Sequence, residues 1–361
     1  MTGSIERAEP IPFRLPLRKP WRFGDHRITE RRGWLVRVTD TNGVIGWGEA
    51  APFPEVGTES PRRAKEWLEA ALAGLAGMTP EQALGILPPA SKAPPAARCG
   101  VETALLDLSA KGAGVPLARF LAADATESIA VNAALGTLGS TEPGDLDAAI
   151  AAGFRCLKLK VGVDSPEQEL ARLEQLLERL PDGVELRLDA NRAWTREQAE
   201  HLLSGLQGKP VNLVEEPLRE PDLAALAALR SASPVPLALD ESLGHANLDA
   251  VLAAAAADLL VVKPMRLGGL LPCLEMARRA RAVGVATLVT TTLDGAPATH
   301  GAAHLAAAIE AGGANLAHGL ATGGWLAQDL APGLVVERGR IALPRAPGLG
   351  CTPYPDGAHR T

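Results

Sequence analysis

Residues 154–191 read FRCLKLKVGVDSPEQELARLEQLLERLPDGVELRLDAN, and this stretch decides the fold. Its two ends, 154–160 and 185–189, are short apolar runs that finish on a charged side chain, as buried strands do. Between them, Ser165 and Gln168 have the spacing of a capping box, and leucines then recur at helical intervals. The stretch therefore predicts a strand–helix–strand unit of the kind that builds a parallel sheet.

The same alternation continues on both sides of this unit. We predict eight strands, at 129–134, 154–160, 185–189, 211–215, 235–240, 258–263, 285–290 and 315–319. Eight strands alternating with helices over about 190 residues fit a (β/α) barrel. An open doubly wound sheet is the alternative, but no G-x-G-x-x-G motif follows the first strand, so the barrel is preferred.

The first 125 residues have a different pattern. RGWLVRVTD and VIGWGEA flank Thr41-Asn42-Gly43, which predicts a β-hairpin, and helices are expected at 60–75 and 99–111. The late run LVVERGRIAL is expected to return to this first domain. The predicted organisation is a small α+β domain, the barrel and a tail, at residues 1–125, 126–325 and 326–361.

The composition is that of a globular protein. Of the 361 residues, 47% are hydrophobic and 22% are charged, which excludes disordered and collagen-like classes. A net charge of −6 without a basic run argues against nucleic acid and anionic membrane surfaces as partners. The longest apolar stretch, 250–262, is too short to span a bilayer, and the N-terminus has no apolar signal core. The scattered cysteines favour reduced thiols, so we expect a cytoplasmic protein; its oligomeric state has no signal in the sequence.

Charged residues end successive predicted strands. They are Lys158 and Lys160, then Asp189, Glu215, Asp240 and Lys263. From Lys160 onward, successive members are 23 to 29 residues apart, which is one strand–helix unit each time. Active sites of (β/α) barrels lie at the C-terminal ends of the strands, so these side chains should converge on one mouth. Independent strand-end charges, each satisfied by a cap or a surface ion pair, are the alternative.

Three converging carboxylates require a cation. The oxygen-only set of Asp189, Glu215 and Asp240 suits Mg²⁺, with Mn²⁺ as the alternative metal. Neighbouring positive charge lowers the pKa of an ammonium group, so Lys158, the metal and Lys263 would tune Lys160 towards a general base. A metal that holds a substrate carboxylate stabilises the charge formed when the adjacent carbon loses its proton. The expected chemistry is proton abstraction α to the carboxylate of a small molecule.

Five motifs at these strand ends carry a family resemblance. They are Lys158-x-Lys160, Leu188-Asp189-Ala190-Asn191, Glu215-Glu216-Pro217, Asp240-Glu241-Ser242 and Val262-Lys263-Pro264. Together they resemble the enolase superfamily, muconate-lactonizing subgroup, and GWGEAAP at 46–52 resembles its capping domain. The resemblance implies a modified (β/α)7β TIM-like barrel, an α+β capping domain formed by the N-terminal region and the C-terminal tail, and substrate-covering loops near 16–30 and 51–60.

The resemblance also implies residue roles. It places Mg²⁺ on Asp189, Glu215 and Asp240, with Lys160 and Lys263 on opposite faces of the substrate. In Glu-Glu-Pro the first glutamate is the family's ligand. Lysine at position 263 argues against the mandelate racemase subgroup, which has a His-Asp dyad there.

Four further stretches resemble the o-succinylbenzoate synthases. They are 31–33, 187–191, 266–269 and 318–322. The implied reaction is dehydration of 2-succinyl-6-hydroxy-2,4-cyclohexadiene-1-carboxylate to 2-succinylbenzoate, in menaquinone biosynthesis. In it Lys160 removes the proton and then protonates the departing hydroxyl, while Lys263 supports the other ring face.

Racemases and epimerases of the same subgroup are the nearest alternatives. Dipeptide epimerases of the family share an Asp-x-Asp motif after the last strand, which pairs with the substrate's ammonium group. Here residues 320–324 read LATGG, without a carboxylate, which disfavours dipeptides but not N-succinylamino acids. A non-catalytic barrel that binds a small acid is the alternative outside enzymes, and the intact lysine pair argues against it.

Several residues are weaker candidates. Thr291 and Thr292 follow the seventh strand and Arg187 shares a strand face with Asp189, so all three are candidate substrate-binding residues. His300 and His304 have a spacing that can bind zinc, but a pair on the surface or in the core of a barrel helix is preferred. Trp21 and Phe23 lie in the expected covering loop, where they either exclude water from the site or pack against the capping domain. His318, at the last strand, either contacts the cavity or stabilises a turn.

Overall fold

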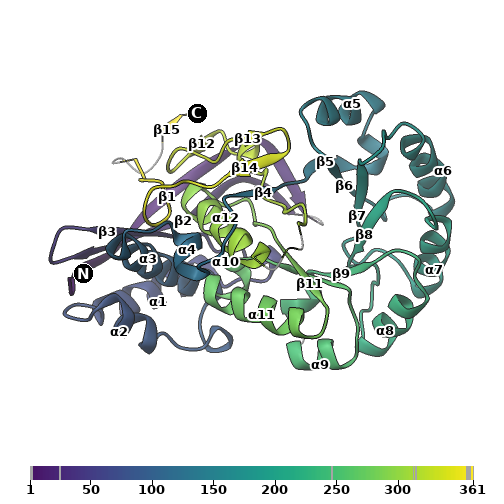
Figure 1. Cartoon of the computed structure of the whole chain (residues 1–361). Coiled ribbons are helices and arrows are strands. Elements are labelled where there is room, and N and C mark those ends of the chain that lie inside the picture. Colours follow the sequence, from purple (N-terminus) through teal and green to yellow (C-terminus); the bar gives the residue numbers. More distant parts are fainter. Residues whose placement is uncertain are drawn as a thin grey trace.

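The computed structural model describes residues 3–23, 26–244, 247–311, 313, 315–354 and 359–360. Figure 1 shows a strand–helix layer on the right and a second group of strands and helices on the left, where the N-terminus lies. Within the described residues, none of the helices combines the length and apolar character needed to cross a membrane.

The right-hand layer is a parallel sheet of seven strands. The strands are β5 (Ala133–Thr137), β6 (Cys156–Lys160), β7 (Glu185–Asp189), β8 (Val211–Glu215), β9 (Leu237–Leu239), β10 (Leu259–Val262) and β11 (Ala286–Val289). They pair in chain order from β5 to β11. Backbone bridges from His318 to Val131 and from Gly319 to Thr290 join the two ends of the sheet. The predicted modified (β/α)7β barrel is confirmed.

Helices and short turns connect these strands. They are α5 (Pro143–Ala151), α6 (Pro166–Leu177), α7 (Arg196–Gly205), α8 (Leu223–Ala232), α9 (Leu248–Ala253), α10 (Pro264–Leu267), α11 (Leu270–Ala282) and α12 (Ala296–Glu310), with 3-10 turns η3 (Leu138–Ser140) and η4 (Glu241–Gly244). Ser165 caps α6 in the predicted capping box, and Thr195 forms a second capping box at the start of α7. In Figure 1, α6, α7 and α8 cover the outer face of the sheet.

Two predicted barrel strands differ from the structure. The run 129–134 is not one strand: β4 (Ser128–Ala130) pairs with the C-terminal segment, and the barrel begins only at β5. The run 315–319 makes isolated bridges in place of a strand. Alternating apolar residues do not reveal such a change of pairing partner, because pairing depends on residues far away in the sequence.

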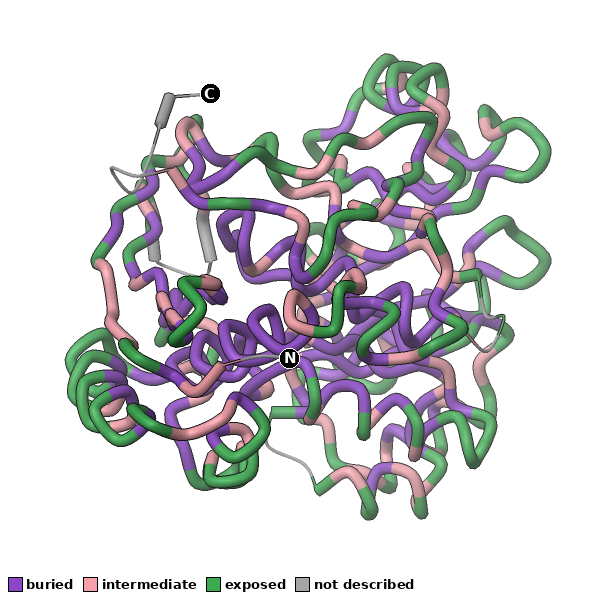
Figure 2. The backbone as a smooth tube through the Cα atoms, turned by 60° about the vertical axis from the view of Figure 1, so that its left-hand side comes forward, coloured by how far each residue is buried: buried purple, intermediate pink, exposed green. Residues whose placement is uncertain are grey.

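The N-terminal region is an antiparallel sheet covered by helices. Its elements are β1 (Ile5–Phe23), β2 (His26–Asp40), β3 (Ile45–Ala50), η1 (Pro54–Val56), α1 (Pro61–Ala73), α2 (Pro80–Ile86), η2 (Ala90–Lys92), α3 (Pro95–Ala113) and α4 (Leu117–Leu121). Residues 96–110 of α3 are all buried, and Figure 2 shows such buried stretches through the middle of the molecule. A Cβ atom on Gly48 would lie 2.0 Å from the Gly100 carbonyl oxygen, so glycine allows α3 to pack on β3.

The expected covering loop at 16–30 is mainly strand. β1 and β2 extend through it as a long antiparallel ribbon, and Trp21 lies near its end. Gly24 and Asp25 lie outside the described residues, as does the side chain of Phe23.

The C-terminal segment contributes η5 (Gly323–Trp325), β12 (Gln328–Asp329), β13 (Val336–Glu337), β14 (Arg340–Ala342) and β15 (His359–Arg360). The run 334–343, expected to return to the first domain, forms the β13–β14 hairpin and pairs with β4. The Ala327 N–H donates to Pro16 of β1 instead. The division of the chain at residues 125 and 325 stays a prediction.

Glu49 of β3 links the N-terminal sheet to the barrel. Its carboxylate is buried and accepts hydrogen bonds from the N–H groups of Gly295 (2.8 Å) and Ala298 (3.2 Å), at the start of α12. Burial first, and then the nearby charges of Asp294 and Asp329, raise the pKa of Glu49 to about 8, although the hydrogen bonds from the Gly295 and Ala298 N–H groups act to lower it. Glu49 therefore carries a proton in the folded protein at neutral pH.

We predict that this proton makes stability depend on pH. The pKa of Glu49 is about 8 in the folded state against an ordinary 4.5, so the folded protein binds the extra proton and loses stability as the pH rises through that window. The loss is at most about 1.4 kcal/mol per pH unit. Denaturant unfolding of the wild type and Glu49→Gln at pH 5 to 8 measures it. The variant should lack this decline, and parallel curves for the two proteins would contradict the prediction.

Candidate functional site

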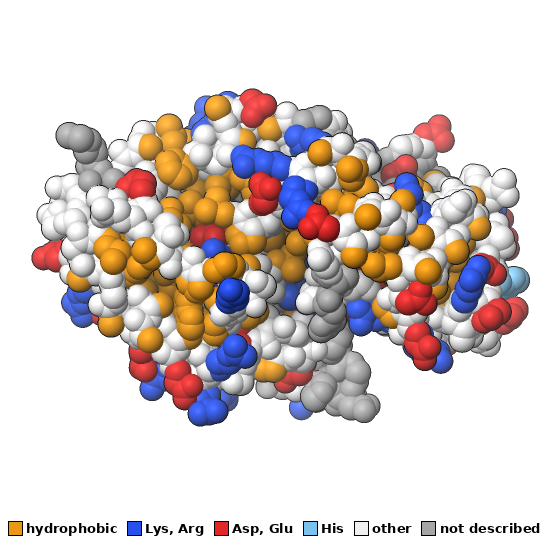
Figure 3. Space-filling view, turned by 90° about the horizontal axis from the view of Figure 1, so that it is seen from below, with side chains coloured by type: hydrophobic (Ala, Val, Ile, Leu, Met, Phe, Trp, Pro, Cys, Tyr) orange, Lys and Arg blue, Asp and Glu red, His pale blue; other side chains and the backbone are white. Residues whose placement is uncertain are grey.

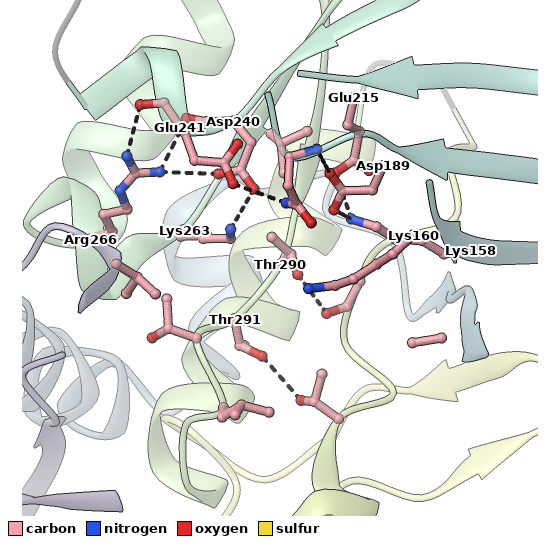
Figure 4. A pocket seen from close by; sticks show the side chains of 18 of the residues that line it. Lys158, Lys160, Asp189, Glu215, Asp240, Glu241, Lys263, Arg266, Thr290 and Thr291 are labelled. Carbon is pink, nitrogen blue, oxygen red and sulfur yellow. Dashed lines mark hydrogen bonds and ion pairs between the residues drawn. The ribbon is translucent and has the colours of Figure 1, made fainter. Parts of the chain in front are cut away.

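A cavity of about 550 Å³ opens at the C-terminal ends of the barrel strands. All the strand-end residues predicted from the sequence line it: Lys158, Lys160, Asp189, Glu215, Asp240 and Lys263. Figure 4 shows side chains from separate strands pointing toward one another. The capping region contributes Trp21, Phe53 and η1 to the opposite wall. The predicted convergence on one mouth is therefore present in the structure.

Lys158 holds two of the carboxylates together. Its Nζ atom lies 2.8 Å from Asp189 and 2.6 Å from Glu215, and both carboxylates are buried. Burial opposes the charge on Lys158, but the two carboxylates outweigh it and raise the pKa of this lysine. For Asp189, burial raises the pKa, and the nearby lysines, Lys158 first, bring it below the ordinary value. Lys158 is therefore an ammonium ion that compensates the acidic side of the cavity.

Asp240 is held by two cations on the opposite side. Lys263 forms an ion pair with it, and Nη1 of Arg266 lies 3.2 Å from its Oδ1 atom. Burial opposes the charge on Lys263, but Asp240 and Glu241 outweigh it and raise the pKa of this lysine. In Figure 4 Lys263 and Arg266 approach Asp240 from different directions.

The raised pKa of Glu241 indicates excess negative charge in this region. Burial raises its pKa to about 7, with further contributions from Asp240 and Asp189. Its Oε1 atom accepts a hydrogen bond from Asn191 at 3.1 Å, whereas Oε2 is buried without a hydrogen-bond partner. The lysines and Arg266 therefore do not compensate all the acid at this end of the cavity.

Lys160 differs from its two lysine neighbours. Its Nζ atom lies 5.4 Å from the ring centroid of Trp21. Burial lowers its pKa, Lys158 and Lys263 lower it further, and Asp189 opposes them. The sequence interpretation attributed a lowered pKa to neighbouring cations, and the structure adds burial as the larger cause. A lysine of lowered pKa can exist as the free amine that accepts a proton.

The acidic residues fit a divalent cation by their chemistry. Asp189, Glu215 and Asp240 offer buried carboxylate oxygens of the kind that Mg²⁺ prefers. The buried Oε2 atom of Glu241 has no hydrogen-bond partner, so the negative charge of this region is not fully compensated. Across the described chain, no group of three or more His, Cys, Asp or Glu side chains already stands in a metal-holding arrangement. The ammonium groups of Lys158 and Lys263 lie against the carboxylates, so a bound cation would have to draw these oxygens away from the lysines.

Glu215 and Glu216 have separate surroundings. Glu215 lines the cavity, whereas Glu216 has a positive φ of 43° and a fully buried side chain. The Glu216 carboxylate accepts hydrogen bonds from the N–H groups of Asp240 and Ser242, both at 2.7 Å. This buried carboxylate fixes the strand end that presents Asp240. The geometry agrees with choosing Glu215 as the candidate ligand.

The weaker candidates also lie at the cavity, but their side chains already form hydrogen bonds with neighbouring protein groups. Thr291 lies 3.1 Å from the hydroxyl of Thr322, and the Thr292 hydroxyl donates to Asp294 at 2.6 Å. Arg187 donates to the Ala317 carbonyl at 2.7 Å and retains a buried Nη2 atom without a partner. All three candidates line the cavity.

The histidines have structural surroundings. His300 and His304 share the Leu349 carbonyl, with ring nitrogens 2.9 and 3.1 Å from it. His318 accepts a hydrogen bond from the Val289 N–H at 2.9 Å. The contacts of His300 and His304 agree with a structural pair in the core, and the His318 contact agrees with a structural role at the end of the sheet.

Sequence reasoning missed several cavity residues, among them Phe53, Asn132, Glu241, Arg266 and Trp325. Glu241 directly follows Asp240, and Arg266 belongs to a motif that carried the family resemblance. The sequence therefore contained enough information to propose both as cavity residues. Phe53 lies in the expected covering segment near 51–60, but nothing in that segment indicates which of its side chains faces the cavity.

Comparison with known proteins identifies the family. Residues 145–357 match the model described as enolase C-terminal domain-like, and residues 6–108 match the MenC N-terminal domain. Muconate cycloisomerase 1 of Rhodococcus opacus is 31% identical, over 96% of this chain and 95% of its own. N-succinyl-L-Arg/Lys racemase of Bacillus cereus is 26% identical, over 81% of each chain.

Solved structures agree in fold. The racemase structure from Bacillus cereus superposes with a TM-score of 0.87, at 23% identity, covering 99% of this chain and 97% of that one. A dipeptide epimerase from Enterococcus faecalis, complexed with Mg and the dipeptide L-Leu-L-Tyr, has a TM-score of 0.83 at 24% identity, covering 98% and 100%. The chain belongs to the enolase superfamily, in the group that contains muconate cycloisomerases, epimerases and racemases.

Proposed function

We propose that the protein is an o-succinylbenzoate synthase, a lyase that dehydrates 2-succinyl-6-hydroxy-2,4-cyclohexadiene-1-carboxylate to 2-succinylbenzoate in menaquinone biosynthesis. The observation that carries the proposed chemistry is a lysine of lowered pKa, Lys160, in one cavity with Lys263 and three buried carboxylates. The MenC match over residues 6–108 supports this choice among the reactions of the family.

The proposed metal ligands are Asp189, Glu215 and Asp240. Mg²⁺ held by these carboxylates would act as a Lewis acid on the substrate carboxylate and acidify the adjacent C–H bond. The Glu216 carboxylate keeps Asp240 in position by accepting a hydrogen bond from the backbone N–H group of Asp240. Lys158, already bound to two of the proposed ligands, would balance their charge and add positive potential beside Lys160.

The proposed proton transfers belong to Lys160. As a free amine its Nζ accepts the proton α to the carboxylate, and the resulting ammonium donates a proton to the departing hydroxyl. One water molecule leaves and the ring becomes aromatic. Lys263, held by Asp240, would face the ring from the other side as a cation. Trp21 and Phe53 would limit access of water to this side of the cavity.

Racemisation of N-succinylamino acids is the second candidate. Two lysines around one cavity could alternate as acid and base, and the Bacillus cereus relative is named a racemase of this type. Dipeptides are a poorer fit, since Gly319, Ala321 and Thr322 bring no carboxylate to the wall where a dipeptide ammonium would need one.

The first prediction on this site concerns Mg²⁺ affinity. Glu215→Gln should weaken Mg²⁺ binding more than about 100-fold, because it removes a direct ligand, whereas Glu216→Gln should weaken it by only about 10- to 100-fold, as expected for a residue that supports a ligand. Isothermal titration calorimetry of the two variants compares a ligand with a supporting residue at adjacent positions. A larger loss in Glu216→Gln would reverse the assignment.

The second prediction concerns turnover. Lys160→Ala should lower kcat for dehydration by about 10²- to 10⁴-fold while Mg²⁺ affinity is retained, because the change removes the base and not a ligand. Absorbance of the product measures dehydration, and NMR in deuterated solvent measures α-proton exchange of N-succinylamino acids. Fast exchange without dehydration would replace the synthase proposal by the racemase. Neither activity in the wild type, with Mg²⁺ bound, would indicate a small-acid-binding barrel.

A further inference from the structure

Arg31 of β2 connects two walls of the cavity without lining it. Its side chain is 4% exposed, and its guanidinium donates hydrogen bonds to three carbonyl groups. Two belong to the capping segment, Ala51 at 2.7 Å and Pro52 at 3.2 Å, and the third is Leu293, 3.2 Å away in the β11–α12 loop. One buried side chain therefore bonds to backbone on both sides of the interface between the capping region and the barrel.

On the capping side, Arg31 also supports an aromatic wall. The guanidinium carbon lies 4.3 Å from the ring centroid of Phe53. Phe53 in turn packs edge-on against Trp21, with centroids 5.7 Å apart, and Trp21 lies beside the amine of Lys160. Cation–π and edge-to-face contacts favour one mutual orientation of these groups. The contacts run without a break from Arg31 to Lys160.

On the barrel side, Arg31 supports a strained loop. Leu293 has a positive φ of 61°, which is unfavourable for leucine, and it lines the cavity. Arg31 binds the carbonyl of this same residue and lies 3.8 Å from the Asp294 carboxylate. Asp294 accepts hydrogen bonds from both the N–H and the hydroxyl of Thr292. The conformation of the loop therefore depends on contacts that include Arg31.

We propose that Arg31 is a positioning residue that determines how the substrate ring lies against Lys160. It fixes the Phe53–Trp21 wall and the Thr292–Leu293 loop relative to each other, so the cavity accepts a planar apolar group in one orientation. This inference rests on the proposed function, in which Lys160 must meet one particular C–H bond. Glu49 holds the same two regions together elsewhere, so Arg31 is not needed merely to join them.

The test compares Arg31→Met with Arg32→Met. Arg32 is the next residue of β2, but its side chain is exposed and paired with Glu30. Arg31→Met should lower kcat/KM for dehydration by about 10- to 100-fold, as expected when reacting groups are displaced by about 1 Å. Arg32→Met should change it less than about twofold. If both variants behave alike, or if Arg31→Met loses activity only in proportion to its unfolded fraction, the proposal is overturned.

A double-mutant cycle with Phe53→Leu tests the route of the effect. If Arg31 acts through Phe53, the double variant should be little worse than the poorer single variant, since each change disrupts the same wall. Independent, multiplicative losses in kcat/KM would contradict the proposal. Arg31→Lys should restore little of the lost kcat/KM, because lysine cannot reproduce the planar guanidinium that donates to three carbonyl groups and contacts the Phe53 ring.

A measurement without substrate separates this inference from the proposed function. Acrylamide quenching of Trp21, obtained by difference from Trp21→Phe, should increase at least twofold in Arg31→Met and not in Arg32→Met. If quenching increases in Arg31→Met but the wild type does not dehydrate the proposed substrate, Arg31 supports the aromatic wall and the synthase proposal is rejected. Unchanged quenching together with normal wild-type turnover would reject the role of Arg31 alone.

Discussion

Buried carboxylates cannot lie close together unless positive charge lies among them, and this constraint organises the cavity. Asp189 and Glu215 share Lys158, and Asp240 is bound by Lys263 and Arg266. Glu241, which has an oxygen without a partner, responds by a raised pKa. One divalent cation bound among the carboxylates would compensate their negative charge, and Lys158 and Lys263 would then no longer be needed for that compensation.

The constraint also separates the three lysines by function. Lys158 and Lys263 are bound to carboxylates that raise their pKa values, whereas burial beside Trp21 lowers that of Lys160. Three residues of the same type within one cavity thus have different pKa shifts because their burial and their charged neighbours differ. This difference is why we propose Lys160 as the base.

Much of the barrel was predictable because its strands are short buried runs that end at the charged cavity. β7 and β8 have the predicted bounds, and the six charged residues at five strand ends line the cavity as the spacing predicted. The split of 129–134 and the bridges at 318–319 were not predictable, since pairing partners there come from distant segments. Trp21 was expected in a covering loop, but its contacts with Phe53 and Lys160 were not predictable, because they depend on the packing of two distant regions.

The capping region completes the cavity instead of merely covering it. Arg31 binds backbone in the β11–α12 loop and Glu49 binds it at the start of α12, while Phe53 and Trp21 line the cavity from the capping region. Outside the cavity the surface has another character: Figure 3 shows acidic and basic side chains interspersed on the face it presents, with hydrophobic ones between them. The paired lysines and carboxylates on which the proposed chemistry depends line the cavity.

A crystal structure of the protein grown with Mg²⁺ tests the central claim most directly. The account predicts one Mg²⁺ bound by oxygen atoms of Asp189, Glu215 and Asp240, with the ammonium of Lys158 displaced from its position between the first two. Mg²⁺ at another place, or the three carboxylates still bound to lysines at saturating Mg²⁺, would contradict it.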